Sequence, residues 1–363
     1  MQNLKGYATN IWVLNNMHIF YRICRGFMRA ILFHKKTLKT IEIFPTLDCN
    51  LECSMCSVQK YKSVKRRQLA TDDYARLASE GAKMGAIAVN ILGGEPLLAD
   101  NLREIISIFK RNHYFVLVVS NATLAKKECL RELKKCGLDA ICFSLDSLDD
   151  AHNEGVRGSK GYVQRVLNAA DVAKKEGLIV SLAPVFFPGK VEKGLEVVKY
   201  CQEHGFGASG TQVGAVGGWE GGNMLSSDEH EKIRNMLKEY PRFTLDWALS
   251  YSLKMCCPAG KEKVAVTTFG DVVGCSINPI AFGNIRNESL LTIWRRMGKF
   301  SQYKKDSPVC LSAEDYGFIQ NYLKPLNDRS EYPLYYKDHP AITSDNEKDL
   351  FEEKEIEANI TAK

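Results

Sequence analysis

Residues 49–56 read Cys49-Asn-Leu-Glu-Cys53-Ser-Met-Cys56, and this stretch of the 363-residue chain decides how the rest is interpreted. Three cysteines at this spacing can bind three irons of a [4Fe–4S] cube, which leaves the fourth iron without a protein ligand. Clusters that only transfer electrons are usually held by four protein ligands. An iron without one can bind a substrate or cofactor, so the stretch predicts a cluster that takes part in chemistry.

Two other interpretations of the three cysteines fit their surroundings less well. Reduced cysteines packed in a core are the first, but the neighbouring Thr46-Leu-Asp48 and Asn50-Leu-Glu52 are not core-like sequences. A zinc site is the second. Zinc usually takes four ligands, and neither a histidine nor a further cysteine lies nearby in the sequence.

The composition is that of a globular protein from a reducing compartment. Twelve cysteines without a secretory leader predict a cytoplasmic protein whose clustered thiols bind metal rather than form disulfides. No uncharged apolar stretch is long enough to span a membrane. The net charge is +6, but the basic N-terminal part lacks a nucleic-acid recognition motif, so no DNA partner is expected and an RNA substrate stays a lesser alternative.

Short β-branched apolar runs alternate with amphipathic helical patterns from residue 40 to about residue 215. Runs that are apolar on both faces are typical of strands in a parallel sheet covered by helices. Here they span residues 40–44, 87–91, 115–119, 140–143, 179–183 and 209–213. Six β/α units in a row predict an α/β fold, a partial (β/α)6 barrel of TIM type, with its chemistry at the carboxyl ends of the strands.

The pattern along the chain divides it into four regions. They are a basic, amphipathic helical segment at 1–39, the barrel at 40–222, a second cysteine-containing region at 223–335 and an acidic, disordered tail at 336–363. The glycine-dense stretch 214–222 marks the boundary between the second and third regions. Asn101 with Glu104 and Ser226 with Glu229 predict capping boxes at two helix starts.

Aromatic and basic residues alternate in residues 11–36, which allows two interpretations. The favoured one is that one or two helices close the bottom of the barrel with their arginines facing water. The other is that this segment lies in a membrane interface and holds the protein there peripherally.

Glycine and polar residues follow the predicted strands where they end. Gly93-Gly94-Glu95-Pro96 comes after the second strand, where glycines let the backbone approach a ligand and a carboxylate can accept hydrogen bonds from an ammonium group. Each such motif alone would be an ordinary turn or cap. At successive strand ends they predict a polar rim at the barrel mouth, to which Ser120, Asn121, Ser144 and Asp146 also belong.

These motifs together resemble the radical S-adenosylmethionine (SAM) superfamily. The resemblance implies that Cys49, Cys53 and Cys56 hold the SAM-binding cluster, and that residues 93–96 bind the amino group of SAM. It also implies ribose contacts from Ser120, Asn121, Ser144 and Asp146, a carboxylate contact from Arg157, and adenine contacts from Gln212 and Val213. Arg157 has a solvated loop arginine as its alternative. One departure is Met55, where the superfamily usually has an aromatic residue.

The resemblance also implies the reaction class. A reductase such as flavodoxin or ferredoxin would reduce the cluster, and SAM would then be cleaved to methionine and a 5′-deoxyadenosyl radical that abstracts hydrogen from substrate. A non-catalytic iron–sulfur electron carrier is the alternative of another class. Among substrates we expect a small molecule or a lipid-linked molecule, with modification of a ribosomally made peptide as the alternative.

A second set of cysteines lies in the C-terminal region, namely Cys256, Cys257, Cys275 and Cys310. Their order around a predicted β-hairpin is similar to that of SPASM and Twitch extensions, which carry auxiliary [4Fe–4S] clusters. A Twitch-like version with one cluster fits best, because the further cysteines of SPASM versions are missing. Three outcomes stay open: Cys256 is the fourth ligand, the cluster keeps an open iron, or these thiols bind no metal.

Overall fold

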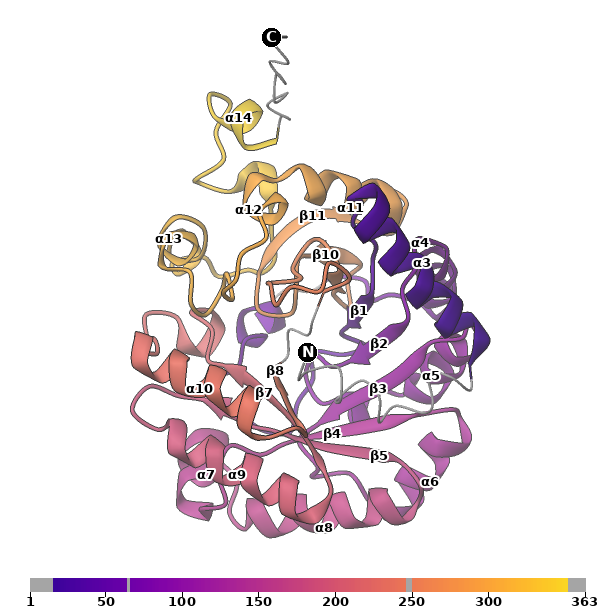
Figure 1. Ribbon diagram of the computed structural model, residues 1–363, viewed down its shortest axis with the longest axis vertical. Coiled ribbons are helices and arrows are strands. Elements are labelled where there is room, and N and C mark those ends of the chain that lie inside the picture. Colours follow the sequence, from indigo (N-terminus) through magenta and orange to yellow (C-terminus); the bar gives the residue numbers. More distant parts are fainter. Residues whose placement is uncertain (1–15, 64–65, 246–249, 352–363) are drawn as a thin grey trace, which may run out of the picture.

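Six parallel strands form the centre of the molecule. The structure is a computed structural model that describes residues 16–63, 66–245 and 250–351 (Figure 1). Each strand of the series pairs in parallel with the next. The series is β1 (Thr40–Ile43), β2 (Ala88–Ile91), β3 (Phe115–Ser120), β4 (Ala140–Ser144), β5 (Ile179–Ala183) and β7 (Gly207–Gln212). The prediction of a partial barrel is confirmed.

Helices cover the outside of this curved sheet, as Figure 1 shows. Helix α5 (Leu102–Arg111) illustrates why: its residues Leu102, Ile105, Ile106 and Phe109 recur at helical spacing and are all buried. Around the barrel lie α4 (Thr71–Met84), α5 (Leu102–Arg111), α6 (Lys127–Lys135), α7 (Asp150–Arg157), α8 (Tyr162–Lys175), α9 (Val191–His204) and α10 (Ser227–Glu239). Shorter turns are η1 (Gln59–Ser63), η2 (Pro96–Leu98) and η3 (Gly217–Trp219).

The C-terminal region extends the same sheet. Strand β9 (Lys263–Val266) pairs in parallel with β1 over its whole length. From there β10 (Asp271–Val273), β11 (Ile280–Asn284) and β12 (Leu334–Tyr335) continue the sheet, while β8 (Phe243–Leu245) pairs with β7 and the short β6 (Val185–Phe186) also joins β7. The expected small extension at 223–335 is therefore joined to the barrel by a continuous hydrogen-bonded ladder (Figure 1).

Helix α3 (Met17–Phe33) lies across the end of the barrel where the strands begin. Arg22 donates hydrogen bonds to the backbone oxygens of Ala86, Asn112 and His113, which all precede strands. The sequence predicted a helix at this end with its arginines facing water. The position agrees, but Arg22 instead binds carbonyl groups that the ends of α4 and α5 leave unpaired. Trp12 and the rest of residues 1–15 lie outside the described residues. No helix in the described part of the chain is long and apolar enough to cross a membrane.

The sequence predicted a disordered tail at 336–363, and this prediction is wrong for residues 336–351. Tyr336 is buried and stacks on Phe282, with ring centroids 5.4 Å apart, and Phe351 of α14 (Glu347–Phe351) stacks on Phe300 at 5.4 Å. These aromatic contacts bury enough apolar surface to order an acidic segment. The other C-terminal helices are α11 (Leu290–Lys299), α12 (Ser301–Lys304) and α13 (Tyr316–Phe318), with turns η4 (Ile319–Leu323), η5 (Lys324–Leu326) and η6 (Tyr336–Asp338). Residues 352–363 lie outside the described residues.

One predicted capping box is confirmed and the other is wrong. The Ser226 hydroxyl accepts from the backbone N–H of Glu229, whose carboxylate accepts from that of Ser226. Asn101 makes no side-chain cap, and the Glu104 carboxylate accepts from the Thr71 hydroxyl of α4 instead, at 3.0 Å. A tertiary partner has displaced the local one.

A buried ion pair fixes the carboxyl end of β4. The Arg157 guanidinium donates to both oxygens of Asp146 at 2.7 and 2.9 Å, and the backbone N–H of Val185 donates to the same carboxylate. Both charged side chains are almost wholly buried. Burial lowers the pKa of Arg157, but the charge and hydrogen bonds of Asp146, with help from Tyr162 and Cys53, together raise it by more, so the pKa ends above its usual value.

We expect Asp146→Asn to lower the free energy of unfolding by about 3–5 kcal/mol, because it leaves the Arg157 charge buried without a counter-ion. The matched control is Arg131→Ala, which breaks the exposed pair with Glu176 and should cost less than about 1 kcal/mol. Denaturant unfolding of the metal-free protein measures both values. Equal losses in the two variants would contradict this account.

Candidate active site

A cavity of about 600 Å³ occupies the interior of the barrel. Cys49, Cys53 and Cys56 line it at the end where the strands finish. Thr40 and Phe115, at the opposite ends of their strands, line it as well, so the cavity runs along the height of the barrel. Its walls are mostly apolar, which is typical of a ligand site with a few polar groups for orientation.

The cysteine loop follows β1 and is held on one side by the glycine motif after β2. The backbone N–H groups of Gly94 and Glu95 donate to the carbonyl oxygens of Thr46 and Asp48, at 2.9 and 2.7 Å. A Cβ atom at Gly94 would overlap the Asp48 carbonyl group. Only glycine therefore allows these two backbones to approach so closely.

A second glycine pair holds the other side of the loop. The backbone N–H of Gly218 donates to the carbonyl oxygen of Cys56 at 3.0 Å, and a Cβ atom at Gly218 would overlap the carbonyl oxygen of Ser54. The sequence indicated a domain boundary in this glycine-dense stretch. The structure shows in addition that it packs against the cysteine loop, a contact that no local pattern reveals.

The three thiols lie close enough to influence one another. Burial raises the pKa values of Cys53 and Cys56, and the neighbouring thiols raise both further, while Arg157 acts in the opposite direction. Such thiols ionise readily only when a metal replaces their protons. No three cysteine, histidine or acidic side chains of the described residues are arranged around one metal ion. A cube, however, places each thiolate on a different iron, so this donor set fits a [4Fe–4S] cluster with one open corner.

Glu95 organises the polar rim next to the cysteines. Its buried carboxylate accepts from the Ser120 hydroxyl at 2.9 Å and from the backbone N–H groups of Asn121 and Leu97 at 2.7 and 3.0 Å. Burial raises the pKa of Glu95, and these three hydrogen bonds act against the rise. The Asn121 amide in turn lies 3.8 Å from the Cys49 sulfur.

Most of the other predicted site residues line the same cavity. Besides the cysteines and Glu95 these are Gly93, Gly94, Ser120, Asn121, Ser144, Arg157, Gln212 and Val213, with Met55 beside them. Pro96 and Asp146 do not line it: Pro96 begins η2, and Asp146 faces Arg157. The roles of these two residues in holding SAM stay predictions.

Gln212 has a hydrogen-bonding atom ready for a ligand. Its side-chain nitrogen lies 3.0 Å from Nδ1 of the His230 ring, which fixes the amide. Its Oε1 is buried and has no hydrogen-bond partner within the described residues. A buried acceptor without a donor is costly, so a ligand N–H in the cavity would satisfy it.

Sequence reasoning missed a buried ion pair inside the cavity. Glu42 of β1 and Lys263 of β9 lie 2.8 Å apart, both almost fully buried, and both line the cavity. The backbone N–H of Ser276 donates to the other Glu42 oxygen at 2.9 Å. The sequence indicated half of this pair, because Glu42 is the only charged residue in a strand whose other residues are typical of a core. Its partner Lys263 is too distant in the sequence to be identified from a local pattern.

The second cysteine group lies directly behind this wall. Cys275 is half-buried by solvent accessibility, and desolvation of its thiol raises the pKa well above the usual value, with further upward contributions from Glu42, Cys257 and Cys310. The Tyr61 hydroxyl beside it is buried without a hydrogen-bond partner within the described residues. Sulfides of a bound cluster accept hydrogen bonds, so an unpaired hydroxyl here fits a cluster held by these thiols.

Cys256 does not join this group. Its thiol interacts with the Ser250 side chain and lies near Lys261, Asp306 and Glu262 rather than near Cys275. The adjacent residues Cys256 and Cys257 thus point their thiols into different surroundings. This favours an auxiliary cluster with three protein thiolates over one in which Cys256 is the fourth ligand.

Comparisons with known proteins agree with this geometry. The radical SAM superfamily model matches residues 43–201, and the SPASM model, an iron–sulfur cluster-binding domain, matches residues 256–313. The PqqA peptide cyclase of Granulibacter bethesdensis is 24% identical over 276 residues, which cover 70% of this chain and 73% of the relative. The GTP 3′,8-cyclase of Aquifex aeolicus is 29% identical over 215 residues, which cover 56% of this chain and 65% of the relative.

Solved structures share the fold. Streptococcus suis SuiB bound to S-adenosylmethionine superposes with a TM-score of 0.59 at 19% identity, covering 74% of this chain and 68% of SuiB. The anSMEcpe structure with bound AdoMet gives a TM-score of 0.55 at 16% identity, covering 74% of this chain and 83% of that protein. Its cofactors are SAM and [4Fe–4S] clusters. The chain belongs to the radical SAM superfamily and carries a SPASM domain after its barrel.

Proposed function

We propose that this enzyme modifies a peptide by removing hydrogen from one of its side chains or backbone carbons. The support is the similarity to PqqA peptide cyclases over most of the chain, together with the resemblance of the fold to SuiB, which also has a structure bound to the precursor peptide SuiA. The sequence alone favoured a small or lipid-linked substrate. The similarity to a nucleotide cyclase, which would favour a small molecule, covers a shorter part of the chain.

The proposed ligands of the SAM-binding cluster are Cys49, Cys53 and Cys56. When bound, the cluster and SAM supply a radical able to take a hydrogen atom from an unactivated carbon. The chain's own residues orient SAM: Glu95 holds Ser120 and Asn121 at the cavity wall, and Gln212 offers an acceptor on the other side. The apolar cavity walls keep water away from the reacting carbon.

Cys257, Cys275 and Cys310 are the proposed ligands of an auxiliary cluster. Ser276 and Ile277, next to Cys275, line the cavity, so an electron left on the substrate has a short path to this centre. The balance of the reaction is then complete. One electron from the reductant would cleave SAM to methionine and a radical, and the hydrogen atom taken from the peptide would turn that radical into 5′-deoxyadenosine. The peptide would also lose one proton to solvent and one electron to the group held by Cys257, Cys275 and Cys310, and would gain a new bond or double bond.

The observation that carries the proposal is one cavity that is lined both by Cys49, Cys53 and Cys56 and by Ser276, the neighbour of Cys275. Its test uses anaerobically reconstituted enzyme, SAM, dithionite and synthetic copies of short peptides encoded beside the gene. We expect 5′-deoxyadenosine and a peptide that has lost two hydrogens, in equal amounts, by mass spectrometry. The variant with all three of Cys49, Cys53 and Cys56 changed to Ala should form neither.

Peptide modification would be contradicted if none of these peptides changed in mass while a small alcohol or a lipid extract stimulated 5′-deoxyadenosine formation. That result would return the substrate to the small-molecule or lipid-linked class. If the intact cluster formed no 5′-deoxyadenosine with any substrate, the electron-carrier alternative would replace the enzyme.

The glycine contacts around the cysteine loop give a prediction about cluster assembly. Gly94→Ala and Gly218→Ala should each reduce the iron bound at the Cys49 loop, because the added methyl group displaces the backbone carbonyl of Asp48 or Ser54. Gly155→Ala is the matched control, since a Cβ atom there meets open space on α7. The amplitude of the SAM-sensitive electron paramagnetic resonance signal reports this cluster. Normal amplitude in both site variants would show that the loop tolerates displacement.

A further inference from the structure

Helix α3 presents an apolar stripe to solvent. Of the twelve large hydrophobic residues that are exposed in the described part of the chain, seven lie on this helix, with exposed fractions between 40% and 70%. They are Met17, Phe20, Tyr21, Met28, Ile31, Leu32 and Phe33. Their spacing of three or four residues places most of them along one side of the helix. A concentrated apolar surface of this kind marks an interaction site.

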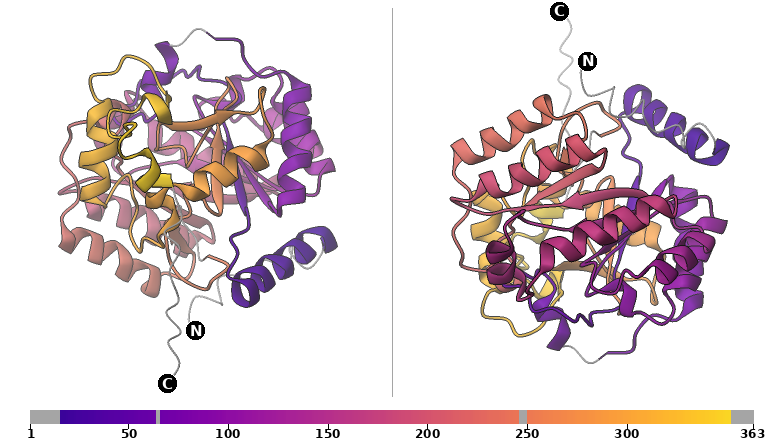
Figure 2. Two further views of the ribbon diagram at one scale, coloured as in Figure 1. Left: turned by 90° about the horizontal axis from the view of Figure 1, so that it is seen from above. Right: turned by 90° about the horizontal axis from the view of Figure 1, so that it is seen from below.

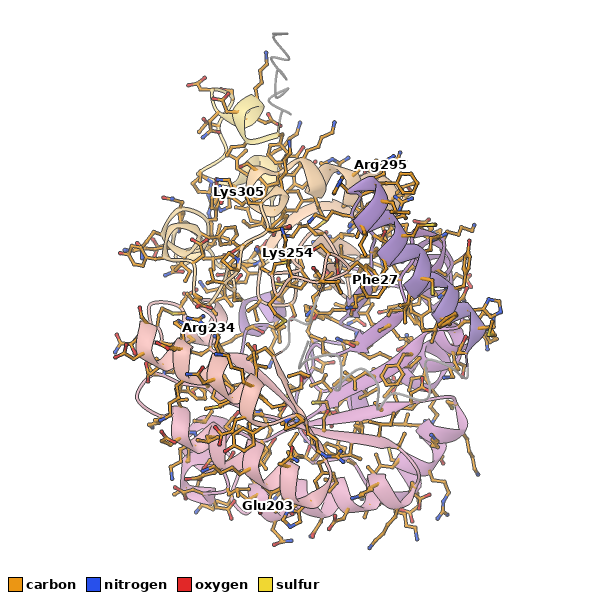
Figure 3. All side chains as sticks on the ribbon, viewed as in Figure 1. Phe27, Glu203, Arg234, Lys254, Arg295 and Lys305 are labelled. Carbon is orange, nitrogen blue, oxygen red and sulfur yellow. The ribbon has the colours of Figure 1, made fainter. Side chains whose placement is uncertain are left out.

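Most amphipathic helices pack against a protein by their apolar face, but α3 turns its apolar stripe to solvent and a more polar face to the barrel. Towards the barrel it presents the buried Ile19 and Gly26 and the side chain of Arg22, which binds backbone oxygens there. Gly26 lies against the ring of Tyr251, and Phe27 meets the same ring edge-on. Phe27 and the exposed Lys254 of the adjoining loop are labelled in Figure 3. The apolar stripe is therefore not used to hold the helix in place.

Positive charge surrounds the stripe. Residues 1–39 contain seven lysines and arginines and neither aspartate nor glutamate. The barrel helices also end on this side, and their last turns carry exposed cations at Lys83, Arg111, Lys134, Lys135, Lys174 and Lys175. Of the acidic groups at this end, Asp139 is paired with Lys110 and Glu176 with Arg131.

This end of the barrel lies opposite the cysteine loop. Figure 2 shows α3, in indigo, on one side of the molecule and the loop around residues 50–63 on the other. A flat surface that covered α3 would thus leave the barrel mouth open to substrate and reductase. The residues before α3 add an apolar run, Ile11-Trp-Val-Leu14, which is part of the same acid-free segment.

We propose that α3 docks the enzyme on an anionic phospholipid bilayer, with the helix lying parallel to the surface. Acyl chains would take up the stripe from Met17 to Phe33, and anionic headgroups would neutralise the cations around it. A nucleic acid would satisfy the cations but not the stripe. The seventeen-residue helix is too short and too interrupted by charge to span the bilayer, in keeping with a surface location. The inference does not depend on the peptide substrate.

Vesicle flotation of the full chain tests this proposal. We expect the protein to float with vesicles of equal parts phosphatidylglycerol and phosphatidylcholine, and much less with phosphatidylcholine alone. Changing Met28, Ile31 and Leu32 together to Ser should weaken binding by about tenfold or more, because the bilayer then takes up three fewer apolar side chains. Lys134→Glu with Lys135→Glu should also weaken it, most clearly at low salt.

Tyr316→Ser is the matched control, since Tyr316 is exposed on α13, away from the stripe, and should float like the wild type. Iron content equal to that of the wild type shows that each variant is folded. The proposal is overturned if the wild-type chain ignores anionic vesicles, or if the triple variant floats equally well. Self-association of the wild type that the triple variant abolishes, without vesicle binding, would assign the stripe to a second copy of the chain instead.

Discussion

The close contact of three backbone segments at the cysteine loop is the constraint on which the site depends. Gly94 lies against Asp48 from one side and Gly218 against Ser54 from the other, at distances that exclude a side chain. A loop with three thiols could otherwise adopt many conformations, and ordering it costs conformational entropy. Two rigid glycine segments, one from each half of the barrel, restrict the loop before any iron binds and keep its thiols at the cavity.

The continuous sheet extends this arrangement to the second cysteine group. Strand β1 leads into the cysteine loop and pairs with β9. Strand β9 in turn pairs with β10, which ends two residues before Cys275. The buried pair of Glu42 and Lys263 joins these two strands side chain to side chain. The two groups of thiols thus follow strands of one continuous sheet, and the hydrogen bonds of that sheet fix their relative position.

Much of this could be predicted from the sequence, because the informative features were local. The six parallel strands, the Cys49 loop and the glycine motif at Gly93 each carry their signal within a few residues. The failures came from contacts between distant segments. Glu104 binds Thr71 rather than capping its own helix, and Tyr336 packs on Phe282 although its surroundings are acidic. The prediction that Cys256 is a cluster ligand stays untested, but its thiol interacts with Ser250, which is also a contact that no local pattern reveals.

The central claim is that two separate sets of three thiols each hold a cluster, and iron and sulfide counts per chain test it most directly. After anaerobic reconstitution the wild type should bind about eight irons, and about four should remain when Cys49, Cys53 and Cys56, or Cys257, Cys275 and Cys310, are changed to Ala. Cys256→Ala should keep the wild-type count. If the wild type binds only about four irons and the Cys49 variant none, the C-terminal thiols are structural and the two-cluster account is wrong.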